Sequence, residues 1–314
     1  MAAAPTLPRI ALTLGDPAGI GPEIALAAAA DARVRAAARL VLIGPRALRG
    51  AGIEWIESAA PERWEMGRVQ RECGAAALAA LRIGHELAAS GEVDALVTAP
   101  VSKEALHLAG ERVEGQTELL GRWSGVTRFE MLAIAGKLRV MLLTRHMPLR
   151  RALESITTAA VLDHLRLFDE SLRRFGIARP RLALAGLNPH AGEGGVLGSE
   201  DGELLVPAVA AARAAGIEVS GPHPPDTVFL QASRGAFDGV LALYHDQAFI
   251  PVKLLSGDGG VTVIAGLPYL RVSPVHGTAF DIAGQGKASP GNLIAALLQA
   301  AEWARVSPPR QIRC

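Results

Sequence analysis

Cysteine and long apolar runs are nearly absent from this sequence. The only two cysteines among the 314 residues are Cys73 and Cys314, and so wide a spacing forms neither a disulfide framework nor a C-x-x-C metal motif. No apolar run approaches the ~18 residues that cross a bilayer. The apolar segment 10–14 is too short for a signal peptide and is interpreted as a first strand. These absences predict a cytoplasmic protein with no membrane contact.

An excess of charge of one sign is also absent. The chain has 32 basic and 31 acidic residues, a net charge of +1, so no overall field attracts nucleic acid or an anionic membrane. Half of the residues are hydrophobic and a fifth are charged, which is typical of a globular protein. The length suffices for one large α/β domain or two lobes with a sizeable core.

Lysine is scarce, since only four of the basic residues are lysine. Because arginine serves almost everywhere else, a lysine here indicates a need for a compact, titratable ammonium group. Lys253 and Arg271 both follow the segment 245–247. Such a pair can hold a phosphate, the lysine as a point charge and the arginine through its fork. Two solvated surface cations are the alternative. Lys103, at another strand end, is a further candidate.

Short apolar runs alternate with helical stretches along the chain. The predicted strands are residues 10–14, 40–43, 93–98, 132–134, 140–143, 182–185 and 240–243. The clearest predicted helix spans residues 158–175, where Leu162, Leu165, Phe168 and Leu172 recur at spacings of three and four. This alternation predicts a mostly parallel sheet covered on both faces, with ligands beyond the carboxyl ends of its strands.

Histidine follows an apolar run in three places, at His146, His190 and His245. Parallel strands end at the same edge of a sheet, so the three imidazoles can converge there. Imidazole is the commonest protein ligand for divalent transition metals, and three ligands leave positions open for a substrate. A polar side chain satisfied at a strand end is the alternative for each alone. The shared context favours a metal site, and three imidazoles suit zinc, cobalt and other divalent metals.

The dinucleotide motif G-x-G-x-x-G is absent after the first predicted strand, because the glycines of segment 15–21 are spaced differently. The segment 273–284 instead resembles the adenosine-binding loop of NAD-dependent isocitrate and isopropylmalate dehydrogenases. An acidic side chain there accepts hydrogen bonds from the ribose hydroxyls and repels the extra phosphate of NADP. Asp281 is therefore expected to select NAD, and His276 to lie against the adenine. A turn-rich connection is the alternative.

Five segments in order resemble the 4-hydroxythreonine-4-phosphate dehydrogenase family. They are G-D-P-A-G-I-G-P-E at 15–23, G-x-T-E at 115–118, N-P-H-A-G-E-G-G at 188–195, Y-H-D-Q at 244–247 and the His276 loop. The resemblance implies an isocitrate/isopropylmalate dehydrogenase-like α/β/α sandwich of two lobes with the active site in the cleft between them. The expected lobes are residues 1–112 with 257–314 on the cofactor side, and residues 113–256 for metal, substrate and dimerisation.

The resemblance also implies roles for individual residues. His146, His190 and His245 match the metal ligands, and Thr117, Lys253 and Arg271 match substrate-binding positions. The family usually has histidine at position 116 and asparagine at position 262, where this chain has Gln116 and Thr262. Both positions contact substrate, so the exact substrate stays open. A homodimer is implied, in which a histidine of the partner subunit completes the metal site.

The family reaction uses NAD to oxidise the 3-hydroxyl of 4-phosphooxy-L-threonine. The keto acid then loses carbon dioxide to give 3-amino-2-oxopropyl phosphate for pyridoxine (vitamin B6) synthesis. A divalent cation such as zinc, magnesium or cobalt lowers the pKa of the hydroxyl. Asp246 and Asp226 are the candidates for the general base.

Other members of this group act on phosphorylated threonate or erythronate, and some on a cyclic dihydrodiol. The presence of Thr117 and Arg271 favours a phosphate-bearing substrate. Two readings from other classes are an acyltransferase, because phosphate acyltransferases share the broad fold, and a non-catalytic binding protein.

Overall fold

The computed structural model describes residues 6–50, 52–59 and 61–306. The chain forms two compact units. Unit 1 runs to Thr127 and resumes at Leu267, and unit 2 is Arg128–Gly266. The lobe boundaries predicted from the sequence were near residues 112 and 256, and the expected roles of the two lobes stay predictions. Within the described ranges, no helix is both long and apolar enough to cross a membrane.

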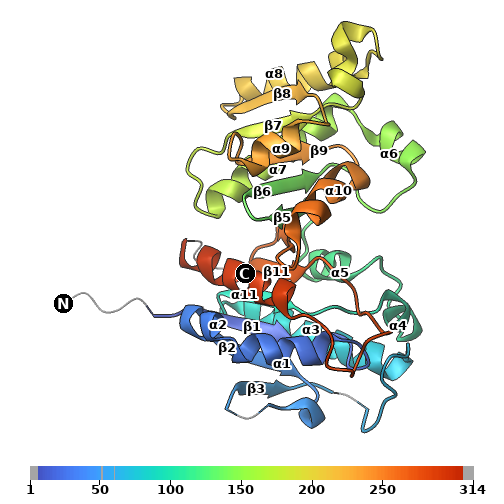
Figure 1. The fold of residues 1–314 in the computed structure, drawn as a ribbon, viewed down its shortest axis with the longest axis vertical. Helices are drawn as coiled ribbons and strands as arrows, with labels where there is room; N and C mark the ends of the chain where they lie inside the picture. Colours follow the sequence, from blue (N-terminus) through green and yellow to red (C-terminus); the bar gives the residue numbers. More distant parts are fainter. Residues whose placement is uncertain (1–5, 51, 60, 307–314) are drawn as a thin grey trace, which may run out of the picture. The chain divides into compact units, whose positions relative to one another are not determined.

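Unit 1 contains a parallel sheet with the strand order β3-β2-β1-β4-β11. Its strands are β1 (Arg9–Thr13), β2 (Arg39–Gly44), β3 (Glu54–Glu57), β4 (Ala95–Thr98) and β11 (Leu270–Pro274). Its helices are α1 (Gly21–Ala30), α2 (Ala32–Ala37), η1 (Arg46–Leu48), α3 (Arg71–Ser90), α4 (Lys103–Leu108), α5 (Gln116–Trp123) and α11 (Gly291–Val306). Helices α1, α2 and α11 cover the face seen in Figure 1, and α3 covers the other.

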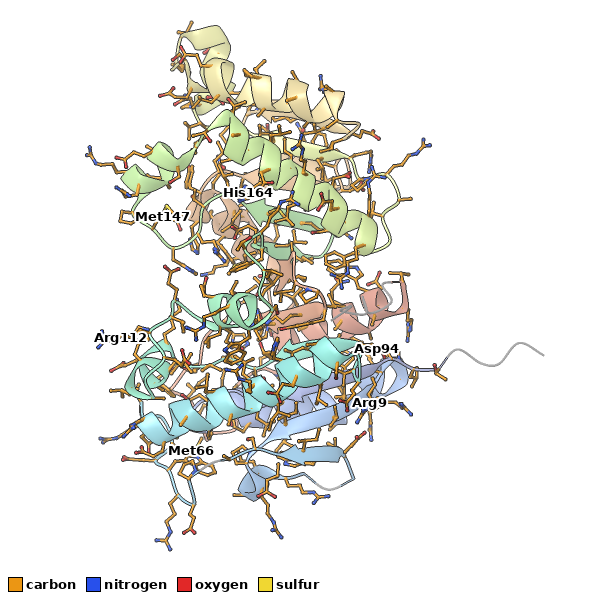
Figure 2. The ribbon with its side chains drawn as sticks, turned by 180° about the vertical axis from the view of Figure 1, so that it is seen from behind. Arg9, Met66, Asp94, Arg112, Met147 and His164 are labelled. Atoms are coloured by element: carbon orange, nitrogen blue, oxygen red, sulfur yellow. The ribbon has the colours of Figure 1, made fainter. Side chains whose placement is uncertain are left out.

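Local sequence explains where these elements begin and end. The central strands are buried on both faces, as expected of a covered parallel sheet. Helix α3 ends at Ser90, and the next residue, Gly91, adopts the left-handed conformation (φ 78°) that glycine accepts without steric cost. The starts of β1 and β4 are joined because the Arg9 backbone N–H donates to the carboxylate of Asp94, just before β4, at 2.7 Å (both labelled in Figure 2).

Unit 2 contains a mixed sheet with the strand order β10-β5-β6-β9-β7-β8. Its strands are β5 (Glu130–Ala135), β6 (Leu138–Leu142), β7 (Leu182–Ala185), β8 (Val219–His223), β9 (Gly239–Ala242) and β10 (Val261–Ala265). Strands β6, β9, β7 and β8 are parallel neighbours, visible side by side in Figure 1, whereas β5 is antiparallel to β6 and β10. The prediction of a mostly parallel α/β fold is confirmed.

The remaining elements of unit 2 are mostly helical. They are α6 (Leu149–Ser155), α7 (Thr158–Arg174), η2 (Pro189–Gly195), η3 (Asp201–Leu205), α8 (Val206–Ala214), α9 (Val228–Ser233) and α10 (His245–Ser256). Helix α7 matches the predicted helix, and the Thr157 hydroxyl caps it by accepting from the Ala160 N–H. Helices α9 and α10 pack on the face of the sheet seen in Figure 1, while α7, which carries the labelled His164, lies in front in Figure 2.

Candidate active-site residues

The three predicted metal histidines follow three neighbouring strands of unit 2. His146 lies four residues beyond β6, His190 lies in η2 beyond β7, and His245 begins α10 just beyond β9. Strand β9 pairs with β6 on one side and β7 on the other, all parallel. The carboxyl ends of the three strands therefore lie at one edge of the sheet. Figure 2 labels Met147, the neighbour of His146.

His146 and His245 lie side by side, with ring centroids 5.1 Å apart. Two imidazoles that bind one zinc ion in tetrahedral geometry place their centroids about 5 Å apart, given Zn–N bonds of about 2 Å. His245 Nδ1 lies 2.8 Å from the Asp246 carboxylate. Because a carboxylate only accepts, Nδ1 carries the proton and Nε2 is left for a metal. The ring of His245 is also stacked on Phe249, at 4.6 Å. The His146–His245 pair therefore fits two ligands of one divalent cation.

His190 lies in a strained turn. His190, Ala191 and Glu193 all have positive φ angles, of 54°, 53° and 44°. A non-glycine residue in this region costs roughly 1–2 kcal/mol, and such strain gathers at functional sites. Among the residues that the structure describes, no three His, Cys, Asp or Glu side chains form a cluster able to hold a metal. One chain thus brings together two of the three predicted histidines and places His190 on the adjacent loop.

Helix α10 presents His245, Phe249 and Lys253 on one face, since the three are spaced by four residues. The Lys253 ammonium lies 5.9 Å from the centre of the Phe249 ring. Asp246 and Asp226, the candidate general bases, are both exposed and line one pocket of about 430 Å³ with residues of α9 and α10. Thr262, a predicted substrate residue, is buried in β10.

Arg271 of β11 is a buried cation in unit 1, only 4% exposed. Its Nη2 donates to the Thr98 hydroxyl at 2.6 Å and to the Gln116 side-chain carbonyl at 3.3 Å. The Arg271 Nε is buried and has no hydrogen-bond partner. Burial lowers the pKa of Arg271 to about 10. The Arg271 guanidinium therefore still has one N–H group, that of Nε, with which it can donate to an anion.

The amino end of α5 lies beside Arg271. Gln116 is its first residue, and its side-chain amide donates to the Ala99 carbonyl at 3.1 Å, so its carbonyl oxygen faces Arg271. Thr117 is buried in the first turn. A Cβ built on Gly115, just before α5, would lie 3.7 Å from Lys103 Cε. Four candidate site residues of unit 1 are thus gathered around one helix start, where backbone N–H groups favour an anion. They are Lys103, Gln116, Thr117 and Arg271.

A glycine-rich loop and the His276 loop of unit 1 contact each other. In the first, residues 15–21 after β1, a Cβ on Gly15 would lie 2.2 Å from the Pro100 carbonyl oxygen, which only glycine avoids. The Ile20 N–H donates to the Thr278 carbonyl of the second loop, residues 273–284, at 3.0 Å. Asp16, within the first loop, is fully buried, and this burial raises its pKa to about 6. The first loop is therefore a fixed support for the second.

The second loop carries the predicted NAD residues. His276 Nδ1 lies 3.0 Å from the Gly277 carbonyl, so this nitrogen holds the proton, and the buried Nε2 has no partner. Nε2 is thus an acceptor, which suits the exocyclic amino group of adenine. The Asp281 side chain is exposed. An acceptor without a partner and an exposed carboxylate fit the adenosine part of NAD.

The structure also shows functional candidates to which the sequence pattern assigns no role. Thr98 holds Arg271, and Phe249 lies between His245 and Lys253. Gln247 and Asp201 hold the backbone of the histidine-bearing loops. The spacing of Phe249 from His245 was a usable signal for one of them. The hydrogen bonds of Gln247 and Asp201 join distant segments and had no local signal.

Comparison with known proteins identifies the family. The model of the family described as "Pyridoxal phosphate biosynthetic protein PdxA" matches residues 19–300. The D-threonate 4-phosphate dehydrogenase of Salmonella typhimurium is 42% identical over 94% of this chain and 98% of its own. The 4-hydroxythreonine-4-phosphate dehydrogenase of Maricaulis maris is 44% identical over 95% and 98%. The crystal structure of the Klebsiella pneumoniae 4-hydroxythreonine-4-phosphate dehydrogenase has a TM-score of 0.87 at 40% identity, covering 95% and 98%. This chain therefore belongs to the PdxA family of pyridoxal phosphate biosynthetic proteins.

Proposed function

We propose that this protein is an NAD-dependent, divalent-metal-assisted dehydrogenase of a small phosphorylated hydroxy acid. Its relatives at 42–44% identity are named as dehydrogenases of such compounds. The observation that carries the proposal furthest is the buried guanidinium of Arg271, which keeps an unused donor.

The phosphate is assigned to the start of α5. Both hydrogen bonds from Nη2 of Arg271 go to neutral oxygens, those of Thr98 and Gln116. A dianionic phosphate accepting from this guanidinium would compensate its desolvation more fully than a neutral acceptor does. Thr117 and Lys103, at the same helix start, supply a hydroxyl and an ammonium. Lys253 of unit 2 stays a proposed substrate cation.

Two substrates are proposed, and the comparisons favour neither. One is 4-phosphooxy-L-threonine, oxidised at its 3-hydroxyl and then decarboxylated to 3-amino-2-oxopropyl phosphate. The other is D-threonate 4-phosphate, named for a relative of equal similarity. Gln116 distinguishes this chain from the usual family pattern, because an amide cannot carry the positive charge that a histidine can offer to a phosphate.

The metal is assigned to His146 and His245, with His190 as the third proposed ligand. A divalent cation bound there would lower the pKa of the substrate hydroxyl and stabilise the negative charge formed on decarboxylation. Asp246 holds Nδ1 of His245, which fixes the tautomer that leaves Nε2 for the metal. Asp226 and Asp246 stay the candidate general bases. Zinc, magnesium and cobalt are the proposed cations.

NAD is proposed as the oxidant on the basis of Asp281. Replacing Asp281 by asparagine removes charged hydrogen bonds to the ribose, worth about 1.5–3 kcal/mol, so kcat/KM for NAD should fall about ten- to hundredfold. The preference for NAD over NADP should shrink, because the repulsion of the 2′-phosphate is lost. Steady-state kinetics with both cofactors measures this. The exposed Glu302 of α11, changed to glutamine, is the matched control. Equal use of NAD and NADP by the unmodified protein would remove the basis of the assignment.

A homodimer with a shared metal site is proposed, and α10 offers a surface for the second copy. Ile250 and Leu254 on this helix are 60% and 80% exposed, and they line the pocket with Asp226 and Asp246. Replacing Leu254 by glutamate is expected to shift sedimentation velocity from dimer to monomer, because a buried charge at an interface is unfavourable. Leu108→Glu on α4, also exposed, should leave the sedimentation unchanged. A monomeric unmodified protein would refute the dimer.

The experiment that tests the proposed function is NADH formation with a panel of phosphorylated hydroxy acids. An acyltransferase would produce no NADH, and its activity would not require a metal bound by the three histidines. A non-catalytic binding protein would bind a phosphorylated acid without turning it over. Location in the cytoplasm stays a prediction.

A further inference from the structure

The loops that carry the three histidines are joined by buried hydrogen bonds inside unit 2. The Gln247 side chain lies at the centre of these bonds and is only 7% exposed. Its carbonyl oxygen accepts from the Leu243 N–H at 2.7 Å, in the turn that leads from β9 to His245. Its amide nitrogen donates to the Gly186 carbonyl at 2.8 Å, in the loop that leads from β7 to His190. One side chain thus bonds to the backbone of two histidine-bearing loops.

The loop of His146 is bound to the same point. The Thr144 hydroxyl, 4% exposed, donates to the Leu243 carbonyl at 2.8 Å. The Leu143 N–H donates to the Ala242 carbonyl, also at 2.8 Å. The Leu243 carbonyl therefore accepts from the Thr144 hydroxyl, and the Leu243 N–H donates to Gln247. The backbone before His146 is held against the backbone before His245 within two residues of each ring.

The far side of the His190 loop is held by Asp201. This carboxylate, 1% exposed, accepts from the backbone N–H groups of Leu187 and Asn188 at 2.8 and 3.0 Å. It also accepts from the Asn188 amide at 3.0 Å. The segment between Gly186 and His190 is thus held at one end by Gln247 and along its length by Asp201. The turn that follows has left-handed φ angles, a conformation that persists only when its surroundings determine it.

We infer that Gln247 is a positioning residue that sets the relative placement of the loops bearing His146, His190 and His245. The inference rests on the proposed metal site and deepens it. Gln247 touches none of the three rings through a hydrogen bond of its own amide, and it acts through the backbone of Gly186 and Leu243. Metal affinity is sensitive to sub-ångström ligand placement, so outer partners typically change it about 10- to 100-fold when removed.

The test measures Co²⁺ binding by the full-length, metal-free protein, with visible absorption and calorimetry as readouts. The variant Gln247→Met keeps the length of the side chain and removes both hydrogen bonds. Its Co²⁺ dissociation constant is expected to rise about 10- to 100-fold, with a changed ligand-field band. Thr144→Val, nearly isosteric, removes only the bond to Leu243 and is expected to weaken Co²⁺ binding several-fold.

Asp238 provides the matched control, because it joins the same two strands at their opposite ends. Its carboxylate accepts from the backbone N–H and the side chain of Arg181, just before β7, at 2.9 to 3.1 Å, and Asp238 itself precedes β9. Asp238→Ala should lower the melting temperature without changing the Co²⁺ dissociation constant or the ligand-field band. A purely structural role for Gln247 would make the two variants alike in all three measurements.

The outcomes separate this inference from the proposed function. Weak, altered Co²⁺ binding by Gln247→Met beside normal binding by Asp238→Ala supports a positioning role. Should Gln247→Met not fold, Gln247→Asn takes its place, because its shorter amide cannot bond to both Gly186 and Leu243. Weakened Co²⁺ binding by Gln247→Asn supports the inference, and unchanged binding overturns it. Wild-type-like Co²⁺ binding by Gln247→Met overturns the inference and leaves the metal site standing. The metal site itself is wrong, and the inference with it, if the unmodified protein binds no Co²⁺. The same holds if His245→Ala binds Co²⁺ as tightly as the unmodified protein does.

Discussion

Replacing His245 by alanine is expected to lower kcat on the order of a thousandfold, because metal-ion stabilisation of a developing oxyanion is worth several kcal/mol. The same variant should bind Co²⁺ far more weakly. His146→Ala should behave alike, since the two rings are adjacent. Both histidines are outside the buried core, so the melting temperature should change little. Steady-state kinetics at saturating divalent cation, with Co²⁺ titration, measures the effect.

His107 of unit 1 is the matched control for these two variants. It is exposed, and its Nε2 donates a hydrogen bond to the Val113 carbonyl at 2.8 Å. His107→Ala should keep normal turnover and Co²⁺ affinity. If His245→Ala and His146→Ala both retain near-normal turnover in the presence of a chelator, the metal assignment is wrong.

Replacing Arg271 by methionine should lower kcat/KM for a phosphorylated substrate about ten- to hundredfold, because a charged hydrogen bond is worth about 1.5–3 kcal/mol. The side chain is buried, and burial lowers its pKa to about 10, which means that folding disfavours its charged form. A neutral side chain of similar length removes this cost. The variant is therefore expected to unfold at an equal or higher temperature while it loses activity.

The pH dependence of this effect can be stated from the same pKa. Arg271 loses its proton near pH 10 in the folded chain and only at a higher pH in the unfolded chain, because burial lowers its pKa to about 10. Its cost to stability is therefore constant between pH 6 and pH 9 and falls only as pH rises above the folded value. The difference in the free energy of unfolding between the variant and the parent should therefore stay constant from pH 6 to pH 9. Arg122→Met, which removes an exposed cation paired with Glu111, is the control and should leave kcat/KM unchanged. Retention of full activity by Arg271→Met would refute the phosphate site.

The alternation of strands and helices was predictable because the sequence repeats it clearly. Helix α7 was found from the spacing of its apolar residues, and it ends one residue from the predicted position. Strands β3, β8, β10 and β11 were missed, the first two for physical reasons. Strand β3 is four half-exposed residues, and β8 contains Gly221 and Pro222, which indicate a turn. Pairing with a neighbouring strand determines both, and a local pattern does not record it.

The sequence predicted site residues only where the side chain itself indicates the chemistry, as histidine does for metal binding. The three histidines were found because each follows an apolar run, and parallel strands place such ends at one edge. Which rings meet depends on loop conformation, including the left-handed turn at His190, and periodicity does not encode it. Gln247 joins segments 61 residues apart in sequence. Arg271 and Thr98 are 173 residues apart. Such contacts become visible only in the folded chain.

The most direct measurement of the central claim is NADH formation from NAD by the purified protein with a divalent cation. The panel contains 4-phosphooxy-L-threonine, D-threonate 4-phosphate, D-erythronate 4-phosphate and their unphosphorylated counterparts. At least one phosphorylated acid should be oxidised with a kcat/KM about a hundredfold or more above that of its unphosphorylated form, as expected when charged contacts to phosphate are lost, and chelation should stop the reaction. No NADH from any phosphorylated acid, or equal rates with the unphosphorylated compounds, would contradict the account.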